Sequence, residues 1–248
     1  MSLAPRYAIY YAPPLQSAFW SAASIWLGWD AARRRPLIQP DINGLADVDL
    51  DRLTKRPRRY GFHATLKAPF ELTDGMHEDA LCTAVKDIAS EREPFELPLK
   101  VSTLHDFIAL RPDGTFYELR DLHETCVQDL EPFRAMLGAE DIERRRKSGL
   151  TRLQDRRMLE WGYPFIFEDF RFHMTLTCRI PDAYLRETIQ SALETYFAPY
   201  VLSGHHIGGI AIFKQNTRED PFYVLKRFDF GSAHSQSGMS ILSQAAST

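Results

Sequence analysis

Hydrophobic and polar residues alternate along two short stretches of the chain, residues 60–67 and residues 170–178. Alternation with a period of two is typical of a half-buried strand, because successive side chains point to opposite faces. Other runs rich in β-branched and aromatic residues, bounded by turn residues, predict further strands. These runs are residues 7–12, 95–101, 107–110, 116–119, 207–213 and 222–228. Between two of them, Pro112-Asp113-Gly114 predicts a hairpin turn.

Apolar residues recur at spacings of three and four in other parts of the chain, which predicts helices. The predicted helices cover residues 15–29, 76–91, 121–160 and 182–197. Residues 31–59 are rich in proline and arginine and are expected to be mostly loop. Residues 231–248 hold six serines and three alanines and are expected to form a flexible tail.

The order of the predicted elements suggests a weak internal repeat. A strand that contains a histidine, then a helix, then two or three strands occurs twice, and Phe116-Tyr117 in the first pass corresponds to Phe222-Tyr223 in the second. Such a repeat predicts two similar lobes that face one another across a shared cleft. We expect one bilobal domain over residues 1–230, with lobes at about residues 60–120 and about residues 170–230.

Composition narrows the class of protein. The chain has 248 residues, of which 44% are hydrophobic and 25% are charged, as in an ordinary soluble globular protein. The net charge of −3 argues against a protein that binds long duplex DNA by bulk electrostatics. This charge does not exclude a small anionic substrate in a local basic pocket. The three cysteines have no metal-type spacing and fit a reducing compartment.

Residues 7–29 contain no charged residue, a feature shared with membrane spans and signal peptides. Pro13 and Pro14 interrupt the stretch and several polar residues dilute it, so neither a membrane span nor a signal peptide is expected. We therefore expect a cytoplasmic protein with no membrane partner.

Two tripeptides of the form His-x-Thr are the candidate chemical groups. They are His63-Ala64-Thr65 and His173-Met174-Thr175, which lie 110 residues apart. In a strand, the histidine and the threonine of each tripeptide share one polar face, and the opposite face is apolar. A third match, His123-Glu124-Thr125, falls in a stretch of helical spacing, where the two side chains point apart. We expect His123 to be a surface residue of a helix.

The residue types suit the cleavage of a phosphate ester. Imidazole titrates near pH 6.5, so one histidine can act as a base and the other as an acid at neutral pH. Each threonine hydroxyl can donate to a non-bridging phosphate oxygen, where negative charge gathers in the transition state. The chemistry requires neither a metal nor another cofactor. Two purely structural histidines and a metal site are the alternatives; His205-His206 could add ligands, but neighbouring strand residues point to opposite faces.

The flanks of both tripeptides resemble a known superfamily. Residues 59–70 read RYGFHATLKAPF, and residues 161–164 read WGYP ahead of FRFHMTLT at residues 170–177. The two His-x-Thr segments resemble those of the 2H phosphoesterases, and the flanks resemble a LigT-like branch associated with phosphonate metabolism. The resemblance covers about residues 5–230. It implies a bilobal α+β fold with antiparallel-rich sheets around a central cleft, helices outside, and His63 and His173 as base and acid.

The same resemblance implies an activity. The branch is linked to pathways that cleave carbon–phosphorus bonds and produce 5-phosphoribosyl 1,2-cyclic phosphate, so a phosphoric diester hydrolase that opens this ring is expected. The expected partner is this small phosphorylated substrate, and a nucleic acid fits less well. Alternatives are an RNA enzyme acting on 2′,3′-cyclic phosphates or 2′–5′ linkages, and a non-catalytic nucleotide- or RNA-binding module.

Several other residues are candidates to bind the substrate phosphates or to line the cleft. They are Lys67, Arg171, Arg59, Tyr117, Tyr223 and Lys214. Lys67 and Arg171 stand out because their parity in the predicted strands matches that of the histidines. The basic run from Arg144 to Lys147 is interleaved with acidic residues, which favours a solvated, salt-bridged helix face over a phosphate-facing flap.

Overall fold

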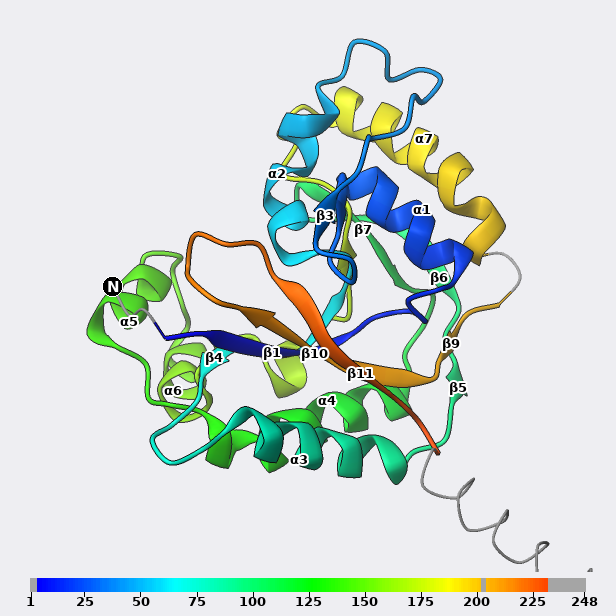
Figure 1. The fold of residues 1–248 in the computed structure, drawn as a ribbon. Helices are drawn as coiled ribbons and strands as arrows, with labels where there is room; N and C mark the ends of the chain where they lie inside the picture. The colour runs from blue at the N-terminus through cyan, green and yellow to red at the C-terminus, as the bar shows by residue number, and fades with distance from the viewer. Residues whose placement is uncertain (1–3, 202–203, 232–248) are drawn as a thin grey trace, which may run out of the picture.

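A seven-stranded antiparallel sheet organises the computed structural model, which describes residues 4–201 and 204–231 (Figure 1). Across the sheet, the order of strands is β11 (Tyr223–Asp229), β10 (Gly209–Gln215), β1 (Arg6–Tyr11), β4 (Ala64–Glu71), β8 (Met174–Thr175), β7 (Phe107–Pro112) and β6 (Leu99–Leu104). Two short strand pairs lie apart from it, β2 (Trp29–Asp30) with β3 (Arg35–Pro36) and β5 (Phe95–Glu96) with β9 (His206–Ile207). The expected tail beyond residue 231 lies outside the described residues.

The sheet consists of two halves, β11–β10–β1–β4 and β8–β7–β6, which meet at a narrow join between β4 and β8. Strands β4 and β8 pair through Ala64 and Met174, whereas β1 and β10 pair along five residues. Each half takes strands from both parts of the sequence, because the hairpin β6–β7 pairs with β8, and β10 pairs with β1. The two lobes therefore do not coincide with residues 60–120 and 170–230. The second histidine strand needs a partner on its outer side, and the hairpin that follows the first histidine strand in sequence supplies it.

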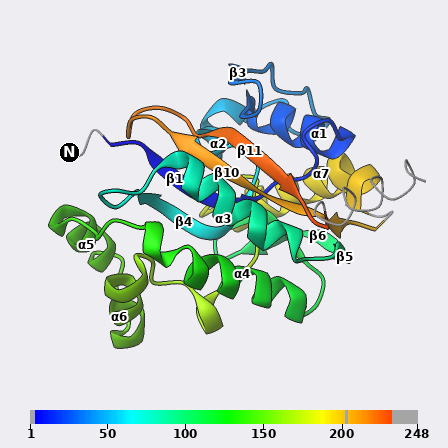
Figure 2. The ribbon, with the colours of Figure 1, turned by 60° about the horizontal axis from the view of Figure 1, so that its bottom comes forward.

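Seven helices of the described chain cover the two halves from outside (Figure 2). They are α1 (Ala18–Leu27), α2 (Leu50–Tyr60), α3 (Glu78–Ser90), α4 (Tyr117–Asp129), α5 (Ala139–Arg146), α6 (Arg152–Trp161) and α7 (Ala183–Val201). Helix α3 packs on β10 and β11, α4 on β4, and α7 on β6 and β7. The α+β class with antiparallel sheets and outer helices is confirmed. Among the described residues, none of the helices combines the length and the apolar character that a membrane-spanning helix needs.

Helix α2 lies in a region that the sequence pattern predicts to be loop. Asp49 caps its first turn by accepting a hydrogen bond from the Arg52 backbone N–H at 3.0 Å. Pro57 lies inside the helix and lacks the N–H that would bond the Leu53 carbonyl. The Cys178 backbone N–H donates to that carbonyl instead, at 2.6 Å. The helix therefore tolerates its proline because a segment far away in sequence replaces the missing donor.

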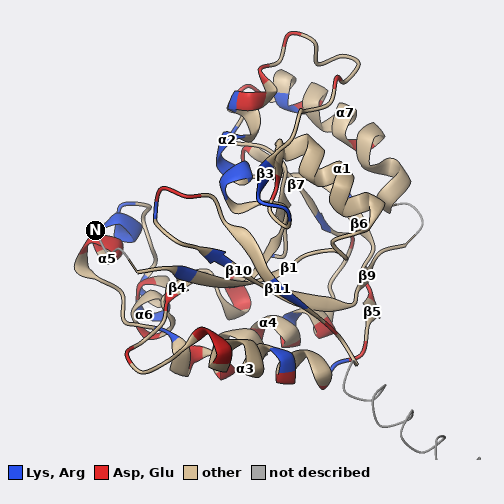
Figure 3. Ribbon diagram, viewed as in Figure 1, with Lys and Arg blue, Asp and Glu red and all other residues tan. Residues whose placement is uncertain are grey.

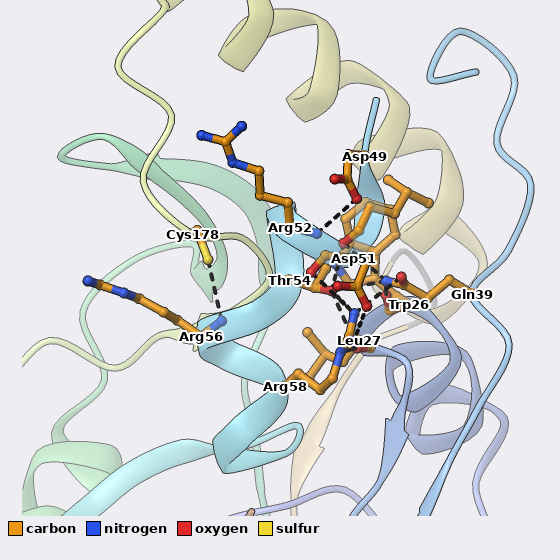
Figure 4. Close-up of polar contacts among 11 residues, drawn as sticks. Trp26, Leu27, Gln39, Asp49, Asp51, Arg52, Thr54, Arg56, Arg58 and Cys178 are labelled. Carbon is orange, nitrogen blue, oxygen red and sulfur yellow. Dashed lines mark hydrogen bonds and ion pairs between the residues drawn. The ribbon is translucent and has the colours of Figure 1, made fainter. Parts of the chain in front are cut away.

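Polar contacts also hold α2 against α1 (Figure 4). The Arg58 guanidinium donates to the Leu27 carbonyl at 2.7 Å and to the Thr54 hydroxyl at 2.8 Å. Gln39 donates to the Trp26 carbonyl at 2.7 Å. Arg58, which precedes the first His-x-Thr segment, is thus occupied in fixing the helix that leads into that segment.

The β6–β7 hairpin turns earlier than the sequence suggests. Leu104 pairs with Phe107, so the turn is His105-Asp106, with His105 at a φ of 55°. The expected turn at residues 112–114 instead leads from β7 into α4. The predicted strand at residues 116–119 is wrong because its apolar residue Leu119 continues the helical spacing of the buried Leu122 and Cys126.

Gly61, which ends α2 just before His63, provides a test of this local geometry. Its φ of 74° and ψ of 178° suit only glycine, and a Cβ there would lie 2.7 Å from the Ala31 Cβ. We expect Gly61→Ala to lower the free energy of unfolding by about 2–4 kcal/mol, from backbone strain plus overpacking. Urea denaturation measures this loss.

Gly75→Ala is the matched control. Gly75 also has a positive φ, 81°, but a Cβ there meets no atom of the described residues within 4 Å. Its substitution should cost only the strain, about 1–2 kcal/mol. Equal losses in the two variants would contradict the tight contact at Gly61.

Candidate functional site

The join between the two half-sheets brings the two His-x-Thr segments together. Because Ala64 pairs antiparallel with Met174, His63 lies opposite Thr175, and Thr65 lies opposite His173. Residues in such opposite positions have Cβ atoms about 4.5–5.5 Å apart. Ala64 and Met174 are fully buried, and the histidines and threonines are partly exposed, so the four polar side chains lie on the other face of the join.

Both histidine rings are oriented in the same way. The Nδ1 atom of His63 lies 2.9 Å from the Gly61 carbonyl oxygen, and that of His173 lies 2.6 Å from the Arg171 carbonyl oxygen. A carbonyl oxygen only accepts, so Nδ1 of each ring carries the proton and donates it. Within the described residues no hydrogen bond is made to either Nε2. Each ring therefore has Nε2 free to accept a proton or, when charged, to donate one.

Burial weakens the affinity of both rings for a second proton. His63 is stacked on Tyr10 with ring centroids 3.8 Å apart, and burial lowers its pKa to about 4. The Gly61 carbonyl partly counters this effect, and the nearby His173 adds to it. Burial is also the main reason that the pKa of His173 is lowered, with the positive charge of Arg111 contributing. The lowered pKa of each ring therefore favours its neutral form, which can act as a base, in the free protein.

An open cavity of about 470 Å³ is lined by His63 and both threonines. This volume suits a small ligand. Neither threonine hydroxyl has a hydrogen-bond partner among the described residues, whereas the nearby Thr177 hydroxyl accepts from the Ile108 N–H at 2.9 Å. The cavity thus offers one imidazole, that of His63, and two hydroxyl donors without other partners among the described residues, whereas His173 lies at the join but is not among the lining residues of either cavity.

A larger cavity of about 700 Å³ adjoins the first. The two share several lining residues, which are Arg6, Tyr60, Ala68, Pro69, Arg144, Arg145 and Tyr163. The shared wall combines three arginines with two tyrosines. Arg144 and Arg145 of the basic run thus border both cavities, whereas Arg146 forms an exposed pair with Asp155, so the expected salt-bridged, solvated face describes only part of the run.

Lys67 was expected to lie beside the histidines, but it does not. Thr65 pairs with Tyr10 and Lys67 pairs with Ile9, so Leu66 is an extra residue that reverses the alternation of faces. The Lys67 ammonium is buried and donates to the Val127 carbonyl and to Glu131, each at 2.8 Å. It borders only the larger cavity. Its predicted position on the histidine face is wrong because of the bulge.

The sequence pattern also predicts the wrong position for Arg171. Its side chain is exposed and donates to the Glu168 and Phe170 carbonyls, at 2.7 and 2.8 Å. It lines neither cavity. Only Met174 and Thr175 of the expected strand at residues 170–178 are in regular β structure, so the alternation does not extend back to Arg171.

Of the remaining candidates, Arg59 lines the larger cavity. The other three line neither cavity. Tyr117 is 81% exposed on α4, the Tyr223 ring lies 3.6 Å from the Arg34 guanidinium, and Lys214 pairs with Glu78 at 2.6 Å. Their predicted places around the histidines are wrong, because residues 116–119 are not a strand, and because β10 and β11, which hold Lys214 and Tyr223, lie beyond β1 from the join.

His123 is separate from the site, but it is not a surface residue. It is 2% exposed, its ring is stacked on Phe170 at 3.8 Å, and its Nδ1 lies 2.8 Å from the Leu66 carbonyl oxygen. His205 is likewise buried and lies 2.5 Å from the Tyr11 hydroxyl. Among the described residues, no group of three or more histidines, cysteines or carboxylates is placed to hold a metal ion.

The sequence pattern missed four residues of the cavity walls, which are Arg6, Tyr10, Arg145 and Tyr163. Arg6 and Tyr10 belong to β1, which lies beside β4 only in the folded sheet. The one available signal for Tyr163 is its place in the WGYP flank. For Arg145, an isolated arginine run gives no indication of which member faces a cavity.

Comparison with known proteins gives a family and two curated relatives. The family described as "Protein of unknown function (DUF1045)" matches residues 65–223. "Ribose 1,5-bisphosphate phosphokinase PhnN" of Janthinobacterium sp. (strain Marseille) is 36% identical over 229 residues, covering 91% of this chain and 51% of that protein. The protein of the same name from Laribacter hongkongensis is 37% identical, covering 71% of this chain and 41% of that protein. The chain spans about half the length of the curated relatives it matches.

Similar solved structures include that of E. coli LigT complexed with NADP+, with a TM-score of 0.43 and 12% identity. The alignment covers 92% of this chain and 99% of that one. A second is a structure described as a phosphoesterase, with a TM-score of 0.39 and 13% identity over 91% of this chain and 98% of that one.

The protonation of His63 can be measured directly. Because burial lowers its pKa to about 4, the ring should stay neutral, with the proton on Nδ1, down to well below pH 6. Long-range ¹H–¹⁵N NMR spectra recorded against pH report both the tautomer and the midpoint, and His63→Ala assigns the signal. A midpoint near 6.5, or a proton on Nε2 of the neutral ring, would contradict the geometry described above.

Proposed function

The chain belongs to DUF1045, a family of unknown function, and we propose that it is a metal-independent cyclic phosphodiesterase with His63 and His173 as the acid–base pair. The observation that carries the proposal is the join of the half-sheets. One antiparallel residue pair sets two His-x-Thr segments side by side, each histidine with Nδ1 engaged and Nε2 free. The same motifs are the basis of the resemblance to 2H phosphoesterases.

In the proposed reaction, water attacks the phosphorus of a cyclic phosphodiester. His63 accepts the water proton on Nε2, because a pKa of about 4 keeps this nitrogen unprotonated at neutral pH. The bond from phosphorus to one ring oxygen breaks, and His173 donates a proton from Nε2 to that oxygen. The negative charge of the bound substrate favours the charged form of His173 that this step requires.

Thr65 and Thr175 have a separate role in this scheme. Their side chains line the cavity without other partners within residues 4–201 and 204–231, and their hydroxyls donate to the non-bridging phosphate oxygens. Each threonine lies opposite the histidine of the other segment. The two halves of the site are therefore related by an approximate twofold arrangement, which suits the attacking and leaving oxygens of an in-line displacement.

The proposed substrate is 5-phosphoribosyl 1,2-cyclic phosphate. Hydrolysis of its bond between phosphorus and the 2-oxygen leaves the phosphate on carbon 1, which gives ribose 1,5-bisphosphate. That compound appears in the name of the curated relatives, which extend well beyond the part matched by this chain. The chemistry of the named compound therefore supports the choice of substrate.

The first test removes each histidine in turn. We expect His63→Ala and His173→Ala each to lower kcat by about 10²–10⁴-fold, because each removes one proton transfer from the same transition state. The double variant should lose much less than the product of the two effects. Steady-state kinetics on the proposed substrate, with circular dichroism to confirm folding, give these values.

A panel of other diesters serves as the control for the choice of substrate. It includes RNA ending in a 2′,3′-cyclic phosphate and a 2′–5′-linked dinucleotide. Normal turnover in either folded single variant would exclude the acid–base pair. Faster cleavage of the RNA substrates would favour an RNA-processing enzyme, and no turnover of any diester would favour a binding module.

A second test concerns metals and the threonines. We expect full activity after exhaustive chelation, because the two imidazoles and two hydroxyls supply all the proposed chemistry. Thr65→Val and Thr175→Val should each cost about 1–3 kcal/mol of transition-state stabilisation, the scale of one hydrogen bond to a charged group. Activity that vanished on chelation and returned with a divalent ion would point to metal-assisted hydrolysis instead.

A further inference from the structure

Arg6 and Arg145 stand where the two cavities meet. Both line the cavity that contains His63 and also the larger cavity beside it. Arg6 begins β1, and Arg145 lies near the end of α5, whose basic positions are close to the start of that strand (Figure 3). The two guanidinium groups also share the electrostatic influence of Tyr60 and Asp141.

Of the other cations that line the larger cavity, all except Arg59 form ion pairs with carboxylates among the described residues. Lys67 and Arg134 both pair with Glu131, and Arg144 pairs with Asp141. Arg218 pairs with Glu71 at 3.0 Å and with Asp141 at 2.9 Å. These four cations share three carboxylates, Glu131, Asp141 and Glu71, which offset most of their positive charge.

Arg6 and Arg145 form no ion pair among the described residues. The Arg6 guanidinium donates to the neutral Gln215 side-chain oxygen, from Nε at 2.9 Å. The Nε of Arg145 is buried and has no hydrogen-bond partner in the part of the chain that the structure describes, and its guanidinium lies 5.3 Å from the centre of the Tyr163 ring. Burial is the main reason that the pKa of each guanidinium is lowered. Arginine nevertheless stays charged in proteins, so each is a partly desolvated cation that has no direct ion-pair partner among the described residues, although Asp141 acts on both from a distance.

We propose that Arg6 and Arg145 bind a second anionic group of the substrate, a terminal phosphate monoester, next to the histidine pair. This subsite rests on the proposed function, since it defines which cyclic phosphodiesters the site accepts. Two guanidinium groups match the two charges of a phosphate monoester and can give charge-assisted, forked hydrogen bonds. Tyr60 and Tyr163 line the same wall of both cavities. The cyclic phosphate itself, with one negative charge, is served by the histidines and threonines.

The subsite is tested by the preference between two substrates, 5-phosphoribosyl 1,2-cyclic phosphate and the same cyclic sugar without its 5-phosphate. The ratio of their kcat/KM values measures recognition of the terminal phosphate. We expect Arg145→Gln and Arg6→Gln each to lower this ratio by about 10- to 100-fold, the loss typical of one charged hydrogen-bonding group. Arg145→Lys, which keeps the charge but not the fork, should give an intermediate ratio.

Arg146→Gln is the matched control. Arg146 is the next residue of α5, lines neither cavity, and forms an exposed pair with Asp155 at 2.7 Å. It should keep the wild-type ratio. An unchanged ratio in folded Arg145→Gln and Arg6→Gln, or an equal fall in Arg146→Gln, would overturn the subsite while leaving the phosphodiesterase in place.

Binding of ribose 5-phosphate separates the subsite from the proposed reaction. Isothermal titration calorimetry should show binding to the wild type and to the His63→Ala/His173→Ala double variant. Arg145→Gln should bind ribose 5-phosphate at least about 10-fold more weakly than the wild type does. If no cyclic diester is hydrolysed but this pattern holds, the subsite stands and the proposed reaction fails. Binding that is insensitive to Arg145 and Arg6 would refute the subsite whatever the reaction.

Discussion

The antiparallel pairing of Ala64 with Met174 is the constraint on which the site depends. The pair closes a seven-stranded sheet from two halves, and its apolar side chains are buried on one face. The flanking histidines and threonines must then lie on the other face. A shift of the register by one residue would move these polar groups into the core, so the burial of Ala64 and Met174 fixes the position of the chemistry.

Strand β8 has only two residues, and contacts from outside the sheet hold the segment that follows it. The Trp26 indole N–H of α1 donates to the Leu176 carbonyl at 2.8 Å, and the Cys178 N–H donates to the carbonyl that Pro57 leaves free in α2. Helix α2 ends at Tyr60 and leads through Gly61 into His63. One helix therefore positions both His-x-Thr segments, the first through the chain and the second through a hydrogen bond.

Local patterns in the sequence predicted those elements whose structure depends on residues close together in the chain. Helices α1, α3 and α7 follow apolar spacing, and the polar faces of the two His-x-Thr segments follow from alternation. Helix α2 was missed because its proline is compensated by Cys178, which is distant in sequence. The exchange of strands between the half-sheets and the bulge that turns Lys67 inward depend on pairing partners that no local pattern specifies. Arg145 was missed because only tertiary structure shows which arginine of the run lacks a carboxylate.

Both histidines are proposed to act on one phosphorus atom. A crystal structure of the protein with orthovanadate, a mimic of the pentavalent phosphorus of the transition state, tests this most directly. The Nε2 atoms of His63 and His173 and the hydroxyls of Thr65 and Thr175 should all lie about 2.6–3.2 Å from vanadate oxygens, with the two Nε2 atoms on opposite sides of the vanadium. Vanadate held by arginines alone, with either Nε2 directed away from it, would contradict the account.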